Sequence, residues 1–451
     1  MEKTPVILIF DVGKTNKKIL LFNKAYELVY EESRQLEETT DEDGFPCEDV
    51  KQLTNWIKEE FHRLSTDRRF EIKAINFSGY GASFVYLDRD GRVSGPLYNY
   101  LKPFPPSLQQ KFYNQYGGEA LVSRQTASPV LGHLNSGLQV YRLKEEQPGW
   151  FSQIQYALHL PQYLSYVLAG LPVSDITSIG CHTLLWDFEK GSYHRWVEEE
   201  GLASRLAPVV PADVPVASTE HGIPVGTGIH DSSAALIPYL ATFREPFVLI
   251  STGTWCISLN PFNKEPLTAD QLAQDCLCYL SYRGEPVKAS RLFAGYAHEQ
   301  AVKRLASHFG KAEDYYTSVR YNPQLVNELT AGDRGFGQPF EQRDLQDFAG
   351  YEEAYHQLML DIIRLQVQST ALVLGNSALR NVFVDGGFSK NSLYMQLLAK
   401  AWPGQDLYAA SVPQASAIGA AMAIHSYWND QPLPASIVSL KKYGPETAVT
   451  L

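Results

Sequence analysis

Two short stretches, lying more than half the chain apart, share one design that constrains the fold more than any other feature. Val6 to Phe22 reads VILIFDVGKTNKKILLF, and Phe247 to Leu259 reads FVLISTGTWCISL. Each combines an apolar run, a tight polar turn with Gly and Thr or Lys, and a second apolar run, which predicts a β-hairpin. The small turn residues leave backbone N–H groups facing outward, where they form a cradle for a phosphate. Either hairpin alone is ordinary, but the pair indicates two related half-molecules that offer their turns to one cleft.

At 451 residues the chain is too long for a single hydrophobic core. We therefore expect two domains, residues 1–240 and 241–451, joined at 238–246, where prolines precede the second hairpin. Strands and helices alternate in both halves, which predicts an α/β fold. The expected strands lie at 72–78 and 382–384, a hairpin at 83–93, and helices at 50–64, 160–171, 352–374, 393–401 and 415–423. The last segment is so rich in small residues that it suits a helix packed closely on another backbone.

Composition excludes several kinds of protein. The net charge of −11 argues against a nucleic-acid partner, which requires a basic surface. No run approaches the ~18 apolar residues of a membrane span, and no signal peptide is recognisable. The 5 cysteines show no disulfide or zinc spacing, which favours a reducing cytoplasm. We expect Cys276 and Cys278 to be alternate residues of a strand, one facing inward and one outward.

The first turn carries the residues for holding a nucleotide phosphate and its cation. Asp11 ends the first strand, and a carboxylate there suits Mg²⁺, which needs only one or two protein oxygens. Gly13, Lys14, Thr15 and Asn16 follow, and their N–H groups, hydroxyl and ammonium suit phosphate oxygens. The alternative is a surface turn with solvated lysines. The spacing is not that of a P-loop.

Two further glycine-containing turns lie in the second half. In Thr252-Gly253-Thr254, two hydroxyls and a glycine allow close approach to a terminal phosphate, although such turns are common. Gly386 and Gly387 follow an apolar strand and precede a helix. Paired glycines let a backbone come close to a flat ligand such as adenine.

The stretch Gly226 to Asp231, GTGIHD, is the most informative. Asp231 precedes SSAAL, which has the pattern of a helix start. Its ordinary role is to cap that helix, and its functional role is a general base that accepts the proton of a sugar hydroxyl. His230 either hydrogen-bonds a substrate hydroxyl or is an ordinary buried histidine.

Taken together, these stretches resemble the FGGY carbohydrate kinase family. The similar segments are DVGKTNKKILLF, PQYLSYVLAGLPVSDITSIGCHTLLW, GTGIHDSSAAL, FVLISTGTWCISL and FVDGGFSKNSLYMQLLAKAW with VPQASAIGAAMA, in family order from about residue 5 to 425. The resemblance implies two ribonuclease-H-like (actin-like ATPase) domains that close over ATP and sugar. It implies Asp231 as base and Asp11 as a Mg²⁺ ligand. The implied nucleotide contacts are Gly13, Lys14, Thr15, Asn16, Thr252, Gly253, Thr254, Gly386, Gly387 and Asn391.

The segments HD and STGTW are most similar to the rhamnulokinase and fuculokinase branch of that family. This branch implies Gly81, His230 and Ser232 near the sugar and Gln300 near the nucleotide.

Three departures from the family pattern stand out. The Trp-Arg-Asp element that many members use against the sugar is missing, and Tyr98-Asn99-Tyr100 stands near its place; Phe388 replaces a third glycine, and Gln414 replaces a frequent Glu. A pocket lined by Tyr80, Phe84, Tyr98 and Tyr100 favours a sugar with an apolar face. The loop 102–107 is proline-rich and is expected to be irregular, at a rim of the cleft.

The sequence thus predicts ATP-dependent phosphorylation of a small sugar, a ketose or 6-deoxyketose such as L-rhamnulose or L-fuculose. The alternatives are a kinase for xylulose or a polyol, an actin-like ATPase without a sugar substrate, and an idle sugar sensor. We expect a cytoplasmic monomer or homodimer with no nucleic-acid or membrane partner.

Overall fold

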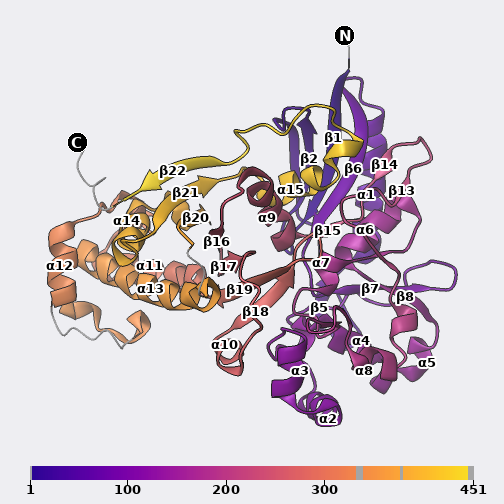
Figure 1. Cartoon of the computed structure of the whole chain (residues 1–451), viewed down its shortest axis with the longest axis horizontal. Coiled ribbons are helices and arrows are strands. Elements are labelled where there is room, and N and C mark those ends of the chain that lie inside the picture. Colours follow the sequence, from indigo (N-terminus) through magenta and orange to yellow (C-terminus); the bar gives the residue numbers. More distant parts are fainter. Residues whose placement is uncertain (1–2, 332–338, 376–378, 445–451) are drawn as a thin grey trace.

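The computed structural model describes residues 3–331, 339–375 and 379–444, which form two lobes. Each lobe is built on one seven-stranded mixed sheet. The N-terminal lobe, largely indigo to magenta in Figure 1, carries the first sheet, and the C-terminal lobe, largely red through orange to yellow, carries the second. No helix among the described residues is long and apolar enough to cross a membrane.

The first sheet grows outward from the first predicted hairpin. Strand β1 is antiparallel to β2, β2 is antiparallel to β3, and β6 is parallel to β1 on its other side. Strands β14 and β15 pair in parallel with β6, and β13 pairs with β14. The strands are β1 (Thr4–Val12), β2 (Lys17–Asn23), β3 (Leu28–Arg34), β6 (Phe70–Gly79), β13 (Ala217–Ser218), β14 (Pro224–Val225) and β15 (Ile229–His230).

The second sheet repeats this arrangement around the second hairpin. Strands β16, β17 and β19 are antiparallel neighbours, and β20 and β21 continue in parallel on the other side of β16. Strands β18 and β22 form the two edges. The strands are β16 (Phe247–Thr252), β17 (Cys256–Asn260), β18 (Cys276–Leu280), β19 (Pro286–Leu292), β20 (Asn381–Gly386), β21 (Asp406–Ser411) and β22 (Ser439–Tyr443). The shared strand order confirms the predicted α/β fold with two ribonuclease-H-like halves.

Alternation along the two hairpin strands divides the core into layers, because successive side chains of a strand point to opposite faces. In β1, Ile7 and Ile9 join a core shared with α9 (Asp231–Thr242) and α15 (Ala415–Ala423). Leu8 instead faces α1 (Val50–Ser65) and α6 (Leu160–Ala169). In β16, Leu249 joins that same shared core, whereas Ile250 faces α13 and α14. The sheets therefore sandwich α9 and α15 and carry other helices on their outer faces.

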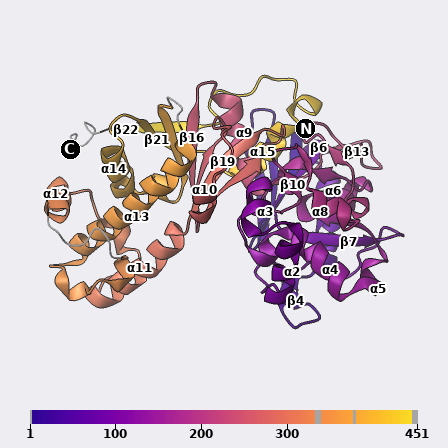
Figure 2. The ribbon, with the colours of Figure 1, turned by 60° about the horizontal axis from the view of Figure 1, so that its bottom comes forward.

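The pair of helices between the sheets joins the two halves of the chain. Helix α9 (Asp231–Thr242) precedes the second sheet, and α15 (Ala415–Ala423) returns from the C-terminal half to pack on α9, β1 and β6. Both views place them between the lobes (Figures 1 and 2). A Cβ on Gly419 would lie 1.8 Å from the carbonyl oxygen of Ala234, so this crossing requires glycine. The small-residue segment is thus the closely packed helix that the sequence predicts.

Other helices cover the outer faces or form a subdomain beside the first sheet. The subdomain contains the two-stranded sheet of β7 and β8 and a core cluster that includes side chains of α2, α4 and α8. The remaining elements are β4 (Glu38–Thr40), β5 (Pro46–Glu48), β7 (Phe84–Asp88), β8 (Ile154–His159), β9 (Ser174–Asp175), β10 (Trp186–Asp187), β11 (Ser192–Tyr193), β12 (Val209–Val210), α1 (Val50–Ser65), α2 (Pro106–Tyr116), α3 (Glu119–Gln125), α4 (Ser136–Glu146), α5 (Pro148–Phe151), α6 (Leu160–Ala169), α7 (Ile176–Ile179), α8 (Arg195–Glu199), α10 (Ala269–Ala273), α11 (Ala294–Phe309), α12 (Pro323–Ala331), α13 (Tyr351–Leu374) and α14 (Ser392–Ala401).

Several local expectations need correction. Helix α2 begins at Pro106 inside the expected irregular loop, since proline is well tolerated in a first helical turn. Pro238 lies inside α9 rather than in a linker. The expected 83–93 hairpin keeps its turn, but β7 pairs mainly with the distant β8. Cys276 and Cys278 are both buried in the same core cluster, because residues two apart in a strand point to the same face.

Candidate active site

The carboxyl ends of three parallel strands bring the candidate catalytic residues together. Asp11 of β1 is in register with Ser78 of β6. On the other side of β6, His230 of β15 is in register with Gly79. Asp11 and Asp231, which follows His230, therefore lie at the same edge of the first sheet although they are far apart in sequence.

Asp231 is the first residue of α9, and its carboxylate is only partly engaged. Its Oδ1 accepts hydrogen bonds from the backbone N–H of Ser232 at 2.6 Å and from the Ser232 hydroxyl at 3.2 Å. The same Oδ1 lies 3.4 Å from His230 Nε2, and the Asp231 side chain is 36% exposed. Oδ2 has no hydrogen-bond donor among the described residues. Asp231 follows the N-cap residue His230, and the described residues form no side-chain cap hydrogen bond at this helix start. One oxygen of the Asp231 carboxylate is thus held by Ser232 and the other is open.

A cavity of about 350 Å³ adjoins this carboxylate and is lined by both lobes. Its size is at the lower end of ligand pockets, which suits a small molecule. The N-terminal lobe contributes Tyr80, Gly81, Ala82, Tyr100, Leu101, Leu134, His182, His230, Asp231 and Ser232, and the C-terminal lobe contributes Trp255, Ile257, Tyr279 and Arg291. The cavity therefore collects all three predicted sugar-side residues.

The predicted ring of four aromatics is only half correct. Tyr80 and Tyr100 line the cavity and pack edge to face, with ring centroids 5.8 Å apart. Phe84 and Tyr98 instead belong to the subdomain core, where Phe84 stacks on His159. Which rings of a strand reach a pocket depends on the partner strand, here β8, and local sequence does not reveal that partner.

His230 is buried and sits tightly beneath the cavity. Its backbone N–H donates to the Thr177 hydroxyl at 3.1 Å, and its Nε2 lies 3.7 Å from the Cys181 sulfur. A Cβ on Gly81 would lie 2.7 Å from the imidazole, so glycine leaves room for the ring. Burial lowers the pKa of His230, which keeps the imidazole neutral and available as a hydrogen-bonding group.

Asp11 experiences a strongly perturbed environment. Burial raises its pKa to about 6, and the nearby negative charge of Asp231 adds to that rise. The hydroxyls of Ser78 and Ser416 act in the opposite sense, and Ser416 Oγ donates to Asp11 Oδ2 at 3.1 Å. A buried carboxyl group whose pKa is raised by burial and by a neighbouring carboxylate is a common feature of functional sites.

The donor set fits Mg²⁺ shared with a nucleotide rather than a cation held by protein alone. Within the described ranges, no three His, Cys, Asp or Glu side chains gather as ligands for a metal ion. Mg²⁺ commonly uses one or two carboxylates and completes its octahedron with water and phosphate oxygens. Asp11 meets that requirement, and a bound cation would relieve the unfavourable proximity of Asp11 and Asp231.

The first turn is a closed loop with an exposed rim. Gly13 N–H donates to the Asn16 carbonyl at 3.0 Å, and Thr15 and Asn16 are exposed. Lys14, a predicted phosphate contact, pairs with Glu38 at 2.7 Å. The buried Lys17 donates to the carbonyl of Lys14 at 3.0 Å and thereby supports the turn from below.

The second turn is clasped by two glycines. A Cβ on Gly386 would lie 1.9 Å from the carbonyl oxygen of Thr252, and one on Gly295 would lie 1.8 Å from that of Gly253. The Thr252 hydroxyl donates to the Asp385 carbonyl at 2.5 Å and accepts from the Phe388 N–H at 2.9 Å. The backbone of Gly386 thus packs directly against the backbone of Thr252, which leaves no room for a Cβ at Gly386. Gly253 and Thr254 are exposed.

The remaining predicted nucleotide residues are divided between two places. The Asn391 side chain caps α14 by accepting from Tyr394 N–H at 3.1 Å, and it donates to the Tyr355 hydroxyl at 2.8 Å. Gln300 lines a separate apolar cavity of about 430 Å³ formed largely by α11 and α13. Gly387 lies beside Thr252, and its N–H donates to the Thr252 carbonyl at 2.8 Å. The Tyr355 hydroxyl also contacts His298 of α11, the helix that carries Gln300. The nucleotide role of these residues stays a prediction.

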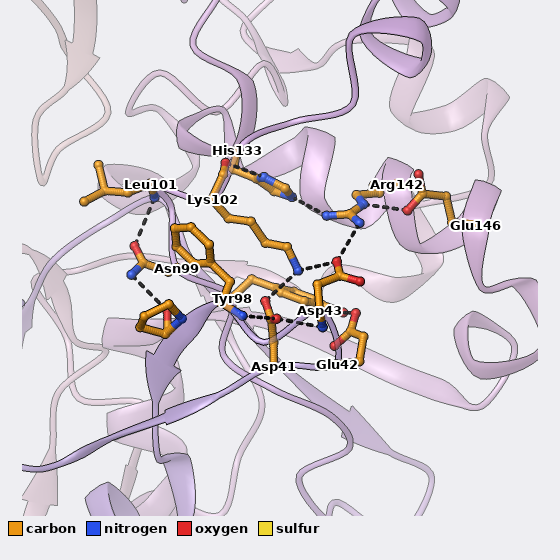
Figure 3. A network of polar contacts seen from close by, with 12 residues as sticks. Asp41, Glu42, Asp43, Tyr98, Asn99, Leu101, Lys102, His133, Arg142 and Glu146 are labelled. Carbon is orange, nitrogen blue, oxygen red and sulfur yellow. Dashed lines mark hydrogen bonds and ion pairs between the residues drawn. The ribbon is translucent and has the colours of Figure 1, made fainter.

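The cavity wall made by Tyr100 and Leu101 is held by a buried ion pair (Figure 3). The Lys102 ammonium lies 2.6 Å from Asp41 and 2.7 Å from Asp43, and the Lys102 and Asp41 side chains are buried. These contacts tie the wall to the turn between β4 and β5.

Two further side chains extend the network to α4. His133 Nδ1 lies 2.7 Å from the carbonyl oxygen of Lys102, and Arg142 bonds Asp43 at 3.1 Å. Burial lowers the pKa of His133 to about 4, so the ring is neutral and donates through Nδ1–H to that carbonyl. The wall of the cavity is thus fixed from three elements of the N-terminal lobe (Figure 3).

The structure also assigns a contact to Gln414, the residue that departs from the family pattern. Its side chain accepts from Lys18 at 3.0 Å and donates to Glu31 at 2.9 Å. The amide thereby links the start of α15 to β2 and β3 of the other half. A carboxylate at this position would face Glu31 with a like charge.

Among the cavity residues that sequence reasoning missed, four have aromatic or charged side chains, namely His182, Trp255, Tyr279 and Arg291. Trp255 could have been predicted from the sequence, since it directly follows the second turn. The other three lie in stretches without a local signal and reach the cavity only through folding.

Comparisons with known proteins agree with the duplicated architecture. A model of the FGGY family of carbohydrate kinases, N-terminal domain, matches residues 6–237. A model of the carbohydrate kinase FGGY, C-terminal domain, matches residues 244–432. The fold and the two family models define a two-lobed α/β protein of the sugar kinase type. The chain belongs to the FGGY family of carbohydrate kinases.

The curated relatives share only modest sequence identity with this chain. The rhamnulokinase of Mannheimia succiniciproducens is 26% identical over 263 residues, which are 56% of this chain and 52% of that protein. The rhamnulokinase of Klebsiella pneumoniae (strain 342) is 28% identical over 232 residues, or 49% of this chain and 46% of that protein. The chain thus matches about half the length of these curated relatives.

Solved structures match over nearly the whole chain. A carbohydrate kinase from Novosphingobium aromaticivorans has a TM-score of 0.79 at 23% identity, covering 98% of this chain and 97% of that one. A xylulose kinase from Rhodospirillum rubrum has a TM-score of 0.80 at 16% identity, covering 98% and 95%. At these identities the likeness establishes the fold.

Proposed function

We propose that this protein transfers the γ-phosphoryl group of ATP to a hydroxyl of a small sugar bound in the cavity between the lobes. The observation that carries this proposal is the Asp231 carboxylate, which lines that cavity with Oδ1 held by Ser232 and Oδ2 open. A carboxylate fixed through one oxygen is well placed to accept a proton through the other.

In this mechanism Asp231 orients the attacking hydroxyl and accepts its proton as the bond to phosphorus forms. Exposed N–H and hydroxyl groups of the two turns, 13–16 and 252–254, bind the phosphates. Asp11 would hold a Mg²⁺ ion, which would supply positive charge to neutralise the transferred group. Closure of the lobes excludes water and aligns the reactants, which accounts for much of the rate in phosphoryl transfer.

The acceptor is a ketose or 6-deoxyketose, with L-rhamnulose and L-fuculose as first candidates. Tyr80 and Tyr100 offer aromatic faces to an apolar side of the sugar, and the curated relatives are rhamnulokinases. Xylulose or a polyol is the alternative, because a xylulose kinase shares the fold.

A panel assay tests the proposal. ADP release is measured with Mg²⁺–ATP and each of L-rhamnulose, L-fuculose, D-xylulose, D-ribulose and glycerol, and the sugar phosphate is identified by ³¹P NMR. Acceptor-dependent ADP release with a matching phosphate ester supports the proposal. Equal ATP hydrolysis with and without every acceptor, together with filament formation, indicates the actin-like ATPase instead.

A further inference from the structure

The acceptor cavity is closed on one side by the C-terminal lobe. Trp255, Ile257, Tyr279 and Arg291 come from β17, β18, β19 and the second turn, whereas Asp231 stands on the N-terminal lobe. A molecule that fills the cavity therefore touches both lobes. Among the described lining residues, Arg291 is the sole Arg or Lys.

The Arg291 guanidinium is held rigidly by its own lobe. Nη2 lies 2.6 Å from Asp275 Oδ1, and Nε lies 3.1 Å from Asp275 Oδ2, which makes a two-pronged ion pair. The guanidinium carbon lies 5.3 Å from the centre of the Trp255 ring, and the side chain is 9% exposed. These contacts use Nε and Nη2, and no described residue accepts a hydrogen bond from Nη1.

The groups that face Arg291 across the cavity are mainly uncharged. Burial lowers the pKa of His182 to about 3, and the Arg291 charge adds to this effect, so that ring is neutral. His230 is likewise neutral at physiological pH because burial lowers its pKa. The Tyr279 ring lies between them, 6.1 Å from each imidazole centre. Asp231 supplies a negative charge.

We propose that Arg291 is a specificity-determining residue that donates a hydrogen bond from Nη1 to an acceptor oxygen distant from the hydroxyl at Asp231. This inference rests on the proposed function and adds a substrate class to it. The acceptor carries oxygen functions at two separated positions, and it bridges the lobes when it binds. Because Asp275 neutralises the guanidinium and Asp231 adds a negative charge, the cavity selects neutral polyhydroxy compounds over their carboxylate analogues.

The test replaces Arg291 and separates acceptor binding from ATP binding. Arg291→Met keeps much of the side-chain volume and removes the donor, and Arg283→Met, at an exposed position of the β18–β19 turn, is the control. We expect the KM for whichever of L-rhamnulose, L-fuculose or D-xylulose the wild type uses best to rise about 10- to 100-fold, the usual scale for a charge-assisted hydrogen bond. The KM for ATP should stay within about twofold, since the hydrogen bonds that the Arg291 side chain makes among the described residues go to Asp275 and not to Thr252, Gly253 or Thr254.

A second variant guards against misfolding. Asp275→Asn keeps the guanidinium in place with a weaker partner and leaves it a net positive charge. The wild type should prefer the ketose that it uses best over D-xylonate, and this preference should shrink in Asp275→Asn by about tenfold.

The outcomes distinguish the two proposals. Phosphorylation of a ketose by the wild type, with an unchanged acceptor KM in a folded Arg291→Met protein, overturns the role of Arg291 alone. An unchanged ketose-to-xylonate ratio in Asp275→Asn overturns the proposed selection for neutral acceptors. A wild type that phosphorylates none of the panel overturns the proposed function itself.

Discussion

Substitution of Gly419 by alanine should disturb stability and catalysis together, because one helix crossing supports both carboxylates. The new Cβ would lie 1.8 Å from the carbonyl oxygen of Ala234, whereas ordinary contacts are longer than 3.0 Å. The helices α9 and α15 must therefore separate by more than 1 Å. The neighbouring atom is backbone, so no side-chain rotation relieves the clash.

The magnitude follows from two opposing contributions. Overpacking of this kind costs about 3 kcal/mol at the upper end of its range. Alanine gains about 1 kcal/mol over glycine in a helix interior. The net destabilisation of about 2 kcal/mol lowers the unfolding midpoint by about 4–8 °C in a domain of this size.

The catalytic effect arises because the crossing links both carboxylates. Helix α9 begins with Asp231, and Ser416 near the start of α15 donates to Asp11 at 3.1 Å. A displacement of about 1 Å costs on the order of 100-fold in turnover when groups must align. Thermal unfolding and acceptor-dependent ADP release measure the two effects.

Gly149→Ala is the control, because its Cβ meets no atom within 4 Å. It should retain the midpoint and turnover of the wild type. A Gly419→Ala protein with the same midpoint and turnover as this control would refute the close crossing of α9 and α15.

Three further predictions concern the network and the second turn. Lys102→Met leaves Asp41 buried without its cation, which should lower the free energy of unfolding in urea by about 3 kcal/mol and raise the acceptor KM. Lys73→Met removes one partner of an exposed ion pair and should change neither quantity. Equal effects of the two substitutions would contradict the network. The pKa of His133 is about 4 in the folded protein and 6.5 in the unfolded chain, so the neutral ring contributes its full stability above pH 6.5. This contribution is lost as the pH falls toward 4, and the loss is about 2 kcal/mol at pH 5. His133→Asn should flatten the decline of unfolding free energy between pH 7 and 5 relative to the exposed His221→Asn, and identical slopes argue against a buried neutral His133. Thr252→Val removes the hydroxyl that links the Asp385 carbonyl to the Phe388 N–H. The free energy of unfolding should fall by about 2 kcal/mol and the KM for ATP should rise, as measured by calorimetry and kinetics. Wild-type values of both quantities would contradict the role of this hydroxyl in the second turn.

Local patterns predicted the parts of the structure that local forces determine. The two hairpins follow from alternating apolar runs around polar turns, and the helix at Ala415–Ala423 follows from its small residues. The ribonuclease-H-like fold of both halves could be predicted as well, because the two hairpins repeat one design and five segments resemble those of one family in the same order.

Residues whose role depends on distant partners could not be predicted. The Thr252 hydroxyl binds backbone groups near residue 386, far along the chain. Phe84 turns into the subdomain core because β7 pairs with β8, and Arg291 reaches the cavity because β19 lies beside β17. For Asp231, sequence offered both a helix cap and a base, and the cavity beside its carboxylate favours the base.

The identity of Asp231 as the base is the central claim, and Asp231→Asn tests it most directly. Single-turnover transfer from Mg²⁺–ATP to the best acceptor of the panel is measured beside ATP affinity by calorimetry. We predict a transfer rate lower by about 10²- to 10⁴-fold, the usual contribution of a positioned base, with ATP affinity within about twofold of the wild type. A transfer rate close to that of the wild type would contradict the account.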